Sequence, residues 1–119
     1  MTEYAGMKCE VCRVGAPPAT SEQIEEFLAD CPDWERITVD GVPQIRRVYG
    51  FDDFAAALEF TNKVGALAEE EGHHPALLTE WGQVTVRWWT HKIHGLHLND
   101  LVMGAKTDRI YLGVGSGYV

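Results

Sequence analysis

The stretch GHHPALLTEWGQVTVRWWTH, residues 72–91, decides the fold. Apolar and polar residues alternate through much of it with the period of two that is typical of β-strands. Gly82-Gln83 interrupts the alternation, and a glycine at the first central position is typical of a type II′ hairpin turn. We therefore predict a β-hairpin whose two antiparallel strands meet at Gly82-Gln83.

This turn sets the register of the hairpin. Trp81 would face Val84, and the pairing would end with His74 directly opposite His91, with Cβ atoms about 5 Å apart. The strand face that carries Trp81 and Val84 is mostly apolar and is expected to pack on helices. The other face carries His74, Arg87, Trp89 and His91, while His73 points away from His74 where the chain is extended.

The segments around this hairpin complete an α+β pattern. A helix is expected after Thr20, which forms a capping box with Gln23, and Pro32 ends it. Asp40-Gly41 predicts the turn of an earlier hairpin. A last helix is expected from about Leu98 to Leu112. The order α-β-β-α-β-β-α predicts a four-stranded antiparallel sheet with helices packed on one face.

The longest periodic segment, residues 52–72, predicts the central helix. Asp52 or Asp53 can cap its start, and Gly72 can end it. Its apolar stripe is expected to be Phe54, Leu58, Thr61, Val64 or Gly65, and Ala68.

Three segments follow from this pattern: an N-terminal arm over 1–19, a single domain over 20–113 and a frayed tail over 114–119. The arm contains Cys9 and Cys12 in a CxxC, which is half of a zinc site, a redox pair or two unremarkable thiols. Cys31 is expected to pack at the apolar end of the first helix.

The composition limits the class of protein. The chain has 119 residues and a formal net charge of −8, which argues against binding to nucleic acid or anionic membranes through bulk charge. No apolar run approaches the roughly 20 residues that span a bilayer. The first residues lack the pattern of a secretory signal. We therefore expect a cytoplasmic protein that acts on neither nucleic acid nor membrane.

The histidines are the candidate chemical groups. An unperturbed imidazole titrates near pH 6.5, so it can both give and take protons at neutral pH. Two or three in one pocket would suit general acid–base catalysis. Surface histidines without a role are the plain alternative. Zinc is another, because His91, His94 and His97 are spaced by threes, although the chain has no HExxH motif.

The motif resembles that of the pterin-4a-carbinolamine dehydratases. In that family an acidic residue is followed, after three positions, by His-His-Pro, then an aromatic residue, a histidine and an aspartate. Here these positions read Glu69, His73-His74-Pro75, Trp81, His91 and Asp100. The resemblance covers roughly residues 20–110, including FDDFAAALEFTNKVGALAEEEGHHP and THKIHGLHLNDLVMGAKTD.

The resemblance implies an enzyme that removes water from 4a-hydroxytetrahydropterin to give quinonoid dihydropterin and so recycles the cofactor of aromatic amino-acid hydroxylases. It implies a homodimer or homotetramer without metal or cofactor, and a hydroxylase as a further partner. The implied catalytic residues are His73, His74 and His91, with acid and base unassigned. The implied substrate-binding residues are Glu69, Pro75, Thr90 and Lys92. Some relatives are instead non-catalytic dimerisation or assembly factors.

Two further residues are expected to support the site rather than react. Asp100 lies three residues after His97, where the acid of a capping box would lie at a helix start. His97 would then occupy the cap position that usually holds Ser or Thr. Trp81 is the second supporting residue that the resemblance implies.

Overall fold

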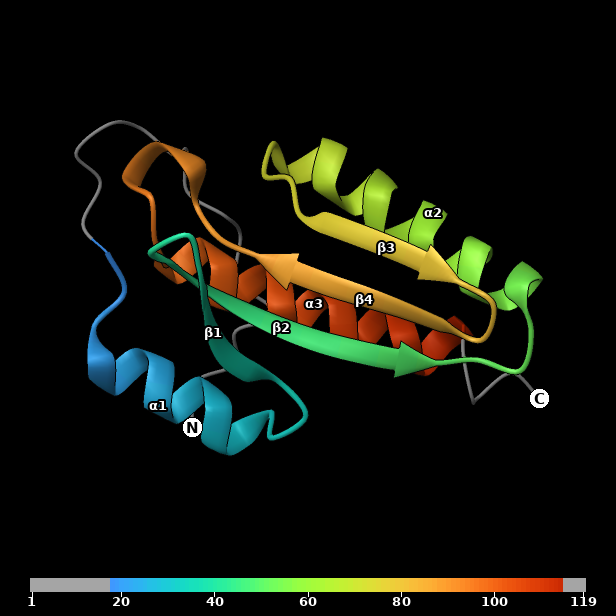
Figure 1. Cartoon of the computed structure of the whole chain (residues 1–119), viewed down its shortest axis with the longest axis horizontal. Coiled ribbons are helices and arrows are strands. Elements are labelled where there is room, and N and C mark those ends of the chain that lie inside the picture. The colour runs from blue at the N-terminus through green and yellow to red at the C-terminus, as the bar shows by residue number, and fades with distance from the viewer. Residues whose placement is uncertain (1–17, 115–119) are drawn as a thin grey trace.

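Between residues 18 and 114 the chain forms one four-stranded antiparallel sheet and three α-helices in the predicted order (Figure 1). This computed structural model describes residues 18–114, so the CxxC of the arm and the tail lie outside the described residues. The elements are α1 (Ser21–Asp30), β1 (Glu35–Val39), β2 (Val42–Gly50), α2 (Phe54–Glu71), β3 (Ala76–Glu80), β4 (Gln83–Trp88), the short 3₁₀ helix η2 (His91–Ile93) and α3 (Leu98–Val114).

The strand order is β1-β2-β4-β3, so the two hairpins join through β2 and β4 at the centre of the sheet. The first hairpin turns at Asp40-Gly41, as predicted. Both turn residues have positive φ, 51° and 80°, which is typical of a type I′ turn. Val39 pairs with Val42 across this turn.

The second hairpin exists, but its predicted register is wrong by two residues. Glu80 pairs with Gln83, and Ala76 pairs with Arg87 rather than Trp89. The two turn residues are therefore Trp81 and Gly82. Gly82 has φ +83° at the second central position, a backbone conformation that glycine adopts at little cost. Because the shift is an even number of residues, each strand residue keeps its predicted face.

The helices cover one face of the sheet and enclose the core between the two layers. From the sheet the core takes Ile45 and Tyr49 of β2 and alternate residues of β4, namely Val84, Val86 and Trp88. The opposite face carries exposed apolar side chains, such as Val48 and Leu78. The capping box of Thr20 and Gln23 is confirmed.

The predicted buried stripe of α2 is partly wrong. Phe54 and Leu58 are exposed. The buried residues of α2 are Ala57, Phe60, Val64 and Ala68. This helix carries apolar residues on more than one side, so periodicity alone does not select the face that meets the sheet. Asp53 caps its start by accepting from the Ala56 amide at 2.8 Å.

α3 lies close to both α1 and β2. A Cβ atom at Gly104 would lie 2.9 Å from Cζ of Phe27 and 3.1 Å from Cδ1 of Ile45, so only glycine permits this approach without a shift. α3 begins at the predicted residue and ends two residues later than predicted, at Val114. The close packing fixes α3, whose first turn carries Asp100, against the sheet.

Candidate active site

Asp100 joins the two ends of the residue 72–91 stretch. Its carboxylate is fully buried, with 0% exposure. Oδ1 lies 2.6 Å from Nε2 of His73, just before β3. Oδ2 accepts a hydrogen bond from the Thr90 hydroxyl at 2.8 Å, just after β4. Distant segments that each carry a histidine therefore meet at one side chain of α3.

His73 is fixed on two sides. α2 ends at Gly72, whose left-handed φ of 67° turns the chain, and the His73 amide then bonds to Ala68 O at 3.1 Å. The imidazole stacks on Trp88, with ring centroids 5.7 Å apart and planes at 5°. Because a carboxylate only accepts hydrogen bonds, Nε2 of His73 carries the shared proton in this pair.

His97 performs the cap role that its position predicts. Its Nδ1 accepts from the Asn99 amide at 3.0 Å, as a Ser or Thr oxygen would at a helix start. Asp100 returns the interaction by accepting from the His97 amide at 2.9 Å. This reciprocal arrangement gives Asp100 its third hydrogen bond and fixes the carboxylate at the first turn of α3.

The prediction that His74 and His91 face each other directly is wrong. His74 is exposed, and its Nε2 lies 2.6 Å from Oε2 of Glu69, at the last turn of α2. His91 begins η2 and is also exposed. The observed register explains this difference, because the β3–β4 pairing ends at Ala76 with Arg87, and both histidines lie outside the paired strands.

The loop that carries His91 closes on itself. Thr90 and Gly95 form an isolated antiparallel bridge, with Thr90 N–H to Gly95 O at 2.8 Å and Gly95 N–H to Thr90 O at 3.3 Å. His94 has φ 52°, which lets the chain turn back between them. His91 is therefore presented on a short closed loop.

The remaining predicted site residues lie in different settings. Lys92 is exposed and Pro75 half-buried beside the histidines in sequence. Thr90 is buried, and its hydroxyl bonds to Asp100. The prediction that Trp81 packs on the helices is wrong. It is 72% exposed in the β3–β4 turn, at the opposite end of that hairpin from His74.

Sequence reasoning placed Arg87 and Trp89 on the histidine face but gave them no role. The Trp89 ring lies 4.6 Å from the His91 ring, and the Arg87 guanidinium lies 5.4 Å from the Trp89 ring centroid. Gln44 was missed because its contact with Arg87 joins strands 43 residues apart in sequence.

A second carboxylate of α3, Asp108, also gathers distant donors. It accepts hydrogen bonds from Trp34 Nε1 at 3.0 Å, Arg47 Nη1 at 2.7 Å and the Tyr49 hydroxyl. Burial, and then the charge of Asp108, raise the pKa of Tyr49 well above its usual range. The same two causes raise the pKa of the Cys31 thiol to about 11, and Cys31 packs against the core as predicted.

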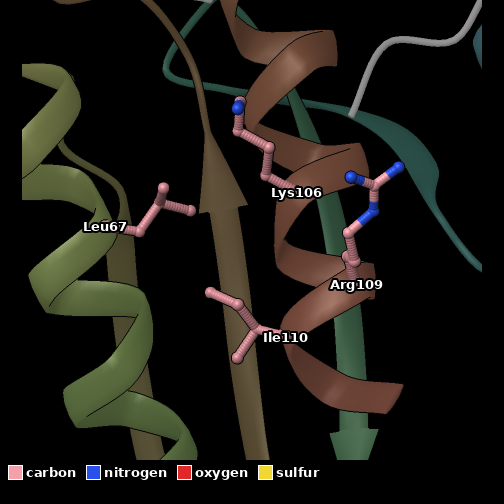
Figure 2. Close-up of a pocket in the computed structure, with 4 residues that line it drawn as sticks. All are labelled: Leu67, Lys106, Arg109 and Ile110. Carbon is pink, nitrogen blue, oxygen red and sulfur yellow. The ribbon is translucent and has the colours of Figure 1, made fainter. Parts of the chain in front are cut away.

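The helical side of the molecule has an open cavity of about 250 Å³ between α2 and α3. Leu67 and Ile110 point toward each other across it, with Lys106 and Arg109 beside them (Figure 2). Nζ of Lys106 lies 3.9 Å from Oε2 of Glu71. None of these four lining residues is a histidine.

Within residues 18–114, no group of three or more His, Cys, Asp or Glu side chains is arranged to hold a metal ion. In the same part of the chain, the helices are too short or too polar to cross a bilayer.

Comparison with known proteins identifies relatives over almost the whole chain. The family model described as "Pterin 4 alpha carbinolamine dehydratase" matches residues 17–110. A protein of Syntrophotalea carbinolica, provisionally named as a pterin-4-alpha-carbinolamine dehydratase, is 61% identical, with 92% of this chain and 98% of the relative covered. A Nitrosococcus oceani protein with the same provisional name is 56% identical, with 92% and 97% covered.

Two solved structures are similar to this chain in fold. A transcriptional coactivator/pterin dehydratase from Brucella melitensis superposes with a TM-score of 0.70 at 30% identity, over 79% of this chain and 98% of that one. A pterin dehydratase-like protein described as a RuBisCO assembly factor shares the fold at 20% identity, with a TM-score of 0.55 over 66% and 88%. The chain belongs to the pterin-4a-carbinolamine dehydratase family.

Proposed function

We propose that this protein removes water from 4a-hydroxytetrahydropterin and releases quinonoid dihydropterin. Family membership supports the reaction class. The observation that carries the assignment to a site is Asp100, whose carboxylate bonds both His73 and Thr90. Each of these residues is adjacent in sequence to an exposed histidine, His74 or His91.

The reaction requires two proton transfers. The C4a hydroxyl leaves as water after it accepts a proton, and a pterin N–H proton must be removed. The exposed imidazoles of His74 and His91 supply a donor and an acceptor that can exchange protons near neutral pH. Glu69 accepts from His74 and fixes the orientation of that ring.

His73 completes the catalytic set from its buried position. Its bond to Asp100 and its stack on Trp88 fix its ring, so it contributes a rigid imidazole at the base of the site. Pro75 and Lys92 would contact the pterin from either segment, together with Glu69. Thr90 would act through Asp100 rather than by touching the substrate, because its hydroxyl is already bonded.

The proposal is tested by generating 4a-hydroxytetrahydropterin and following its dehydration optically. The protein should exceed the spontaneous rate, and His73→Ala, His74→Ala and His91→Ala should each lower kcat by about 100-fold or more, as loss of a general acid or base does. His94→Asn is the matched control, because it removes an exposed imidazole from the same loop and keeps a residue that tolerates φ 52°.

A rate no greater than the spontaneous one would overturn the enzymatic function and favour a non-catalytic assembly role. Unchanged rates in all three alanine variants would overturn the site. The predicted further partner is tested by passing a tetrahydropterin-dependent aromatic amino-acid hydroxylase over the immobilised protein. Retention of the hydroxylase would establish it as a partner, and failure to retain it would remove it from the proposal.

We also propose that the protein self-associates through the outer face of α2. Phe54 and Leu58 are exposed there, and an open surface depression of that helix is lined by Ala55, Leu58, Glu59, Asn62, Lys63 and Ala66. The positions of these lining residues are spaced symmetrically along the helix, with alanine at both ends, so a second copy of α2 can pack antiparallel by a two-fold axis.

Analytical ultracentrifugation tests this interface. The wild type should sediment as a dimer or tetramer, and Leu58→Glu should shift it toward the monomer. Leu112→Glu is the control, because Leu112 is an exposed leucine of α3 rather than α2. A monomeric wild type, or equal effects of the two variants, would contradict the proposal.

A further inference from the structure

His91 is exposed, yet its ring contacts a neighbour on the helix-free face of the sheet. Trp89 and His91 lie two residues apart, and their ring centroids are 4.6 Å apart at an interplanar angle of 36°. This centroid separation lies within the range in which two aromatic rings attract each other. Thr90, between them, points the other way and bonds to Asp100. The backbone at His91 is therefore fixed from the buried side and its ring is contacted from the open side.

Trp89 is contacted in turn by Arg87. The guanidinium carbon lies 5.4 Å from the centroid of the Trp89 ring, within the range of a cation–π interaction. Arg87 itself is oriented, because its Nη1 donates to Oε1 of Gln44 at 2.9 Å. The chain of contacts therefore runs from Gln44 through Arg87 and Trp89 to His91.

Gln44 anchors this series of contacts. Its side chain is only 3% exposed, although it lies in β2 next to the last β2–β4 pair, Ile45 with Trp88. A Cβ atom at Gly95 would lie 3.9 Å from Cδ of Pro43. The loop that carries His91 therefore approaches the same end of β2 from which Gln44 orients Arg87.

We propose that Arg87 and Trp89 are positioning residues for His91, with Gln44 as the anchor of Arg87. This proposal rests on the proposed function only for its kinetic consequence. Its structural content, a restrained orientation of the His91 ring, is independent of catalysis. The restraint matters because a displacement of about 1 Å at a reacting group can cost about 100-fold in rate.

Arg46 provides a matched control for Arg87. The two arginines are direct cross-strand partners on the same face. The Arg46 side chain is directed to Glu35 instead, with Nη2 to Oε2 at 2.7 Å. Arg46→Met and Arg87→Met therefore remove the same charge from adjacent positions, and only Arg87→Met breaks the contact with Trp89.

The test uses NMR of the free, full-length protein together with dehydration kinetics. In the wild type, the ring protons of His91, assigned from the spectrum of His91→Ala, should be shifted by the Trp89 indole. The shift should vanish in Trp89→Leu, decrease in Arg87→Met and Gln44→Leu, and persist in Arg46→Met and in Trp89→Phe, which retains an aromatic ring.

Kinetics then connects the orientation to the reaction. Trp89→Leu and Arg87→Met should lower kcat by about tenfold or more, with a smaller change in KM, because a misplaced catalytic group affects the chemical step. Unshifted His91 protons in the wild type, or equal effects of Arg46→Met and Arg87→Met on them, would overturn the positioning role whatever the activity. If the wild type shows the expected shift of the His91 ring protons but has no dehydratase activity, the proposed function is overturned and the positioning role is not.

Discussion

Two aspartates of α3, eight residues apart, each accept hydrogen bonds from distant parts of the chain, but with different donors. Asp100 is fully buried and accepts from His73, Thr90 and the His97 amide. The Asp108 side chain is 22% exposed and accepts from a tryptophan, an arginine and a tyrosine. Eight residues of helix separate the two carboxylates by about 12 Å along the axis.

The donors indicate different roles for the two aspartates. Those of Asp100 come from the segments that carry the predicted catalytic histidines. Trp34, Arg47 and Tyr49, the donors of Asp108, come from the start of the sheet and from β2, away from the histidines in sequence. We infer that the first aspartate supports catalysis and stability together, whereas the second supports stability alone.

Replacing each aspartate by alanine should give the largest effects. Asp100→Ala removes the acceptor of three buried donors and should lower the free energy of unfolding by about 3–5 kcal/mol. Asp108→Ala should cost less, about 1–3 kcal/mol, because water can reach a partly exposed site. Urea denaturation of both variants measures the difference. A greater loss in Asp108→Ala would reverse the ranking.

Thr90→Val isolates one bond of the Asp100 group. The backbone bridge between Thr90 and Gly95 stays possible, so only the hydroxyl is lost. We expect a loss of stability of about 1–2 kcal/mol and a lower dehydration rate. Thr61→Val is the control, because it removes a hydroxyl of α2 whose Oγ1 lies 2.6 Å from Oγ1 of Thr79 in β3. A rate lowered equally by both variants would remove Thr90 from the site.

A smaller effect, at alkaline pH, should mark the Asp108 group. Burial and the neighbouring carboxylate raise the pKa of Tyr49, so the folded chain keeps a proton that the unfolded chain loses near pH 10. Stability from this group is therefore complete below about pH 9 and falls as the pH rises through 10. Tyr49→Phe should flatten the alkaline fall in the free energy of unfolding, and Tyr111→Phe, which loses a bond to Gly50 O, should preserve it.

Sequence predicted the elements, their order and the strand faces, but not every contact. The predicted register of the second hairpin was wrong by two residues, because Gly82 occupies the second turn position rather than the first. The predicted strand faces were nevertheless correct, since side chains alternate with a period of two. The capping role of Asp100 was predicted locally from its spacing to His97. Its bond to His73, 27 residues away, depends on how α3 packs and has no local signal.

Asparagine variants of the two aspartates test their different roles most directly. Asp100→Asn and Asp108→Asn are nearly isosteric, and each removes one negative charge from α3. We predict that Asp100→Asn lowers kcat for dehydration by about 100-fold, as loss of a group that orients a catalytic imidazole does. Asp108→Asn, measured beside it at a temperature where both are folded, should keep the wild-type rate. Equal rates in the two folded variants would contradict the account.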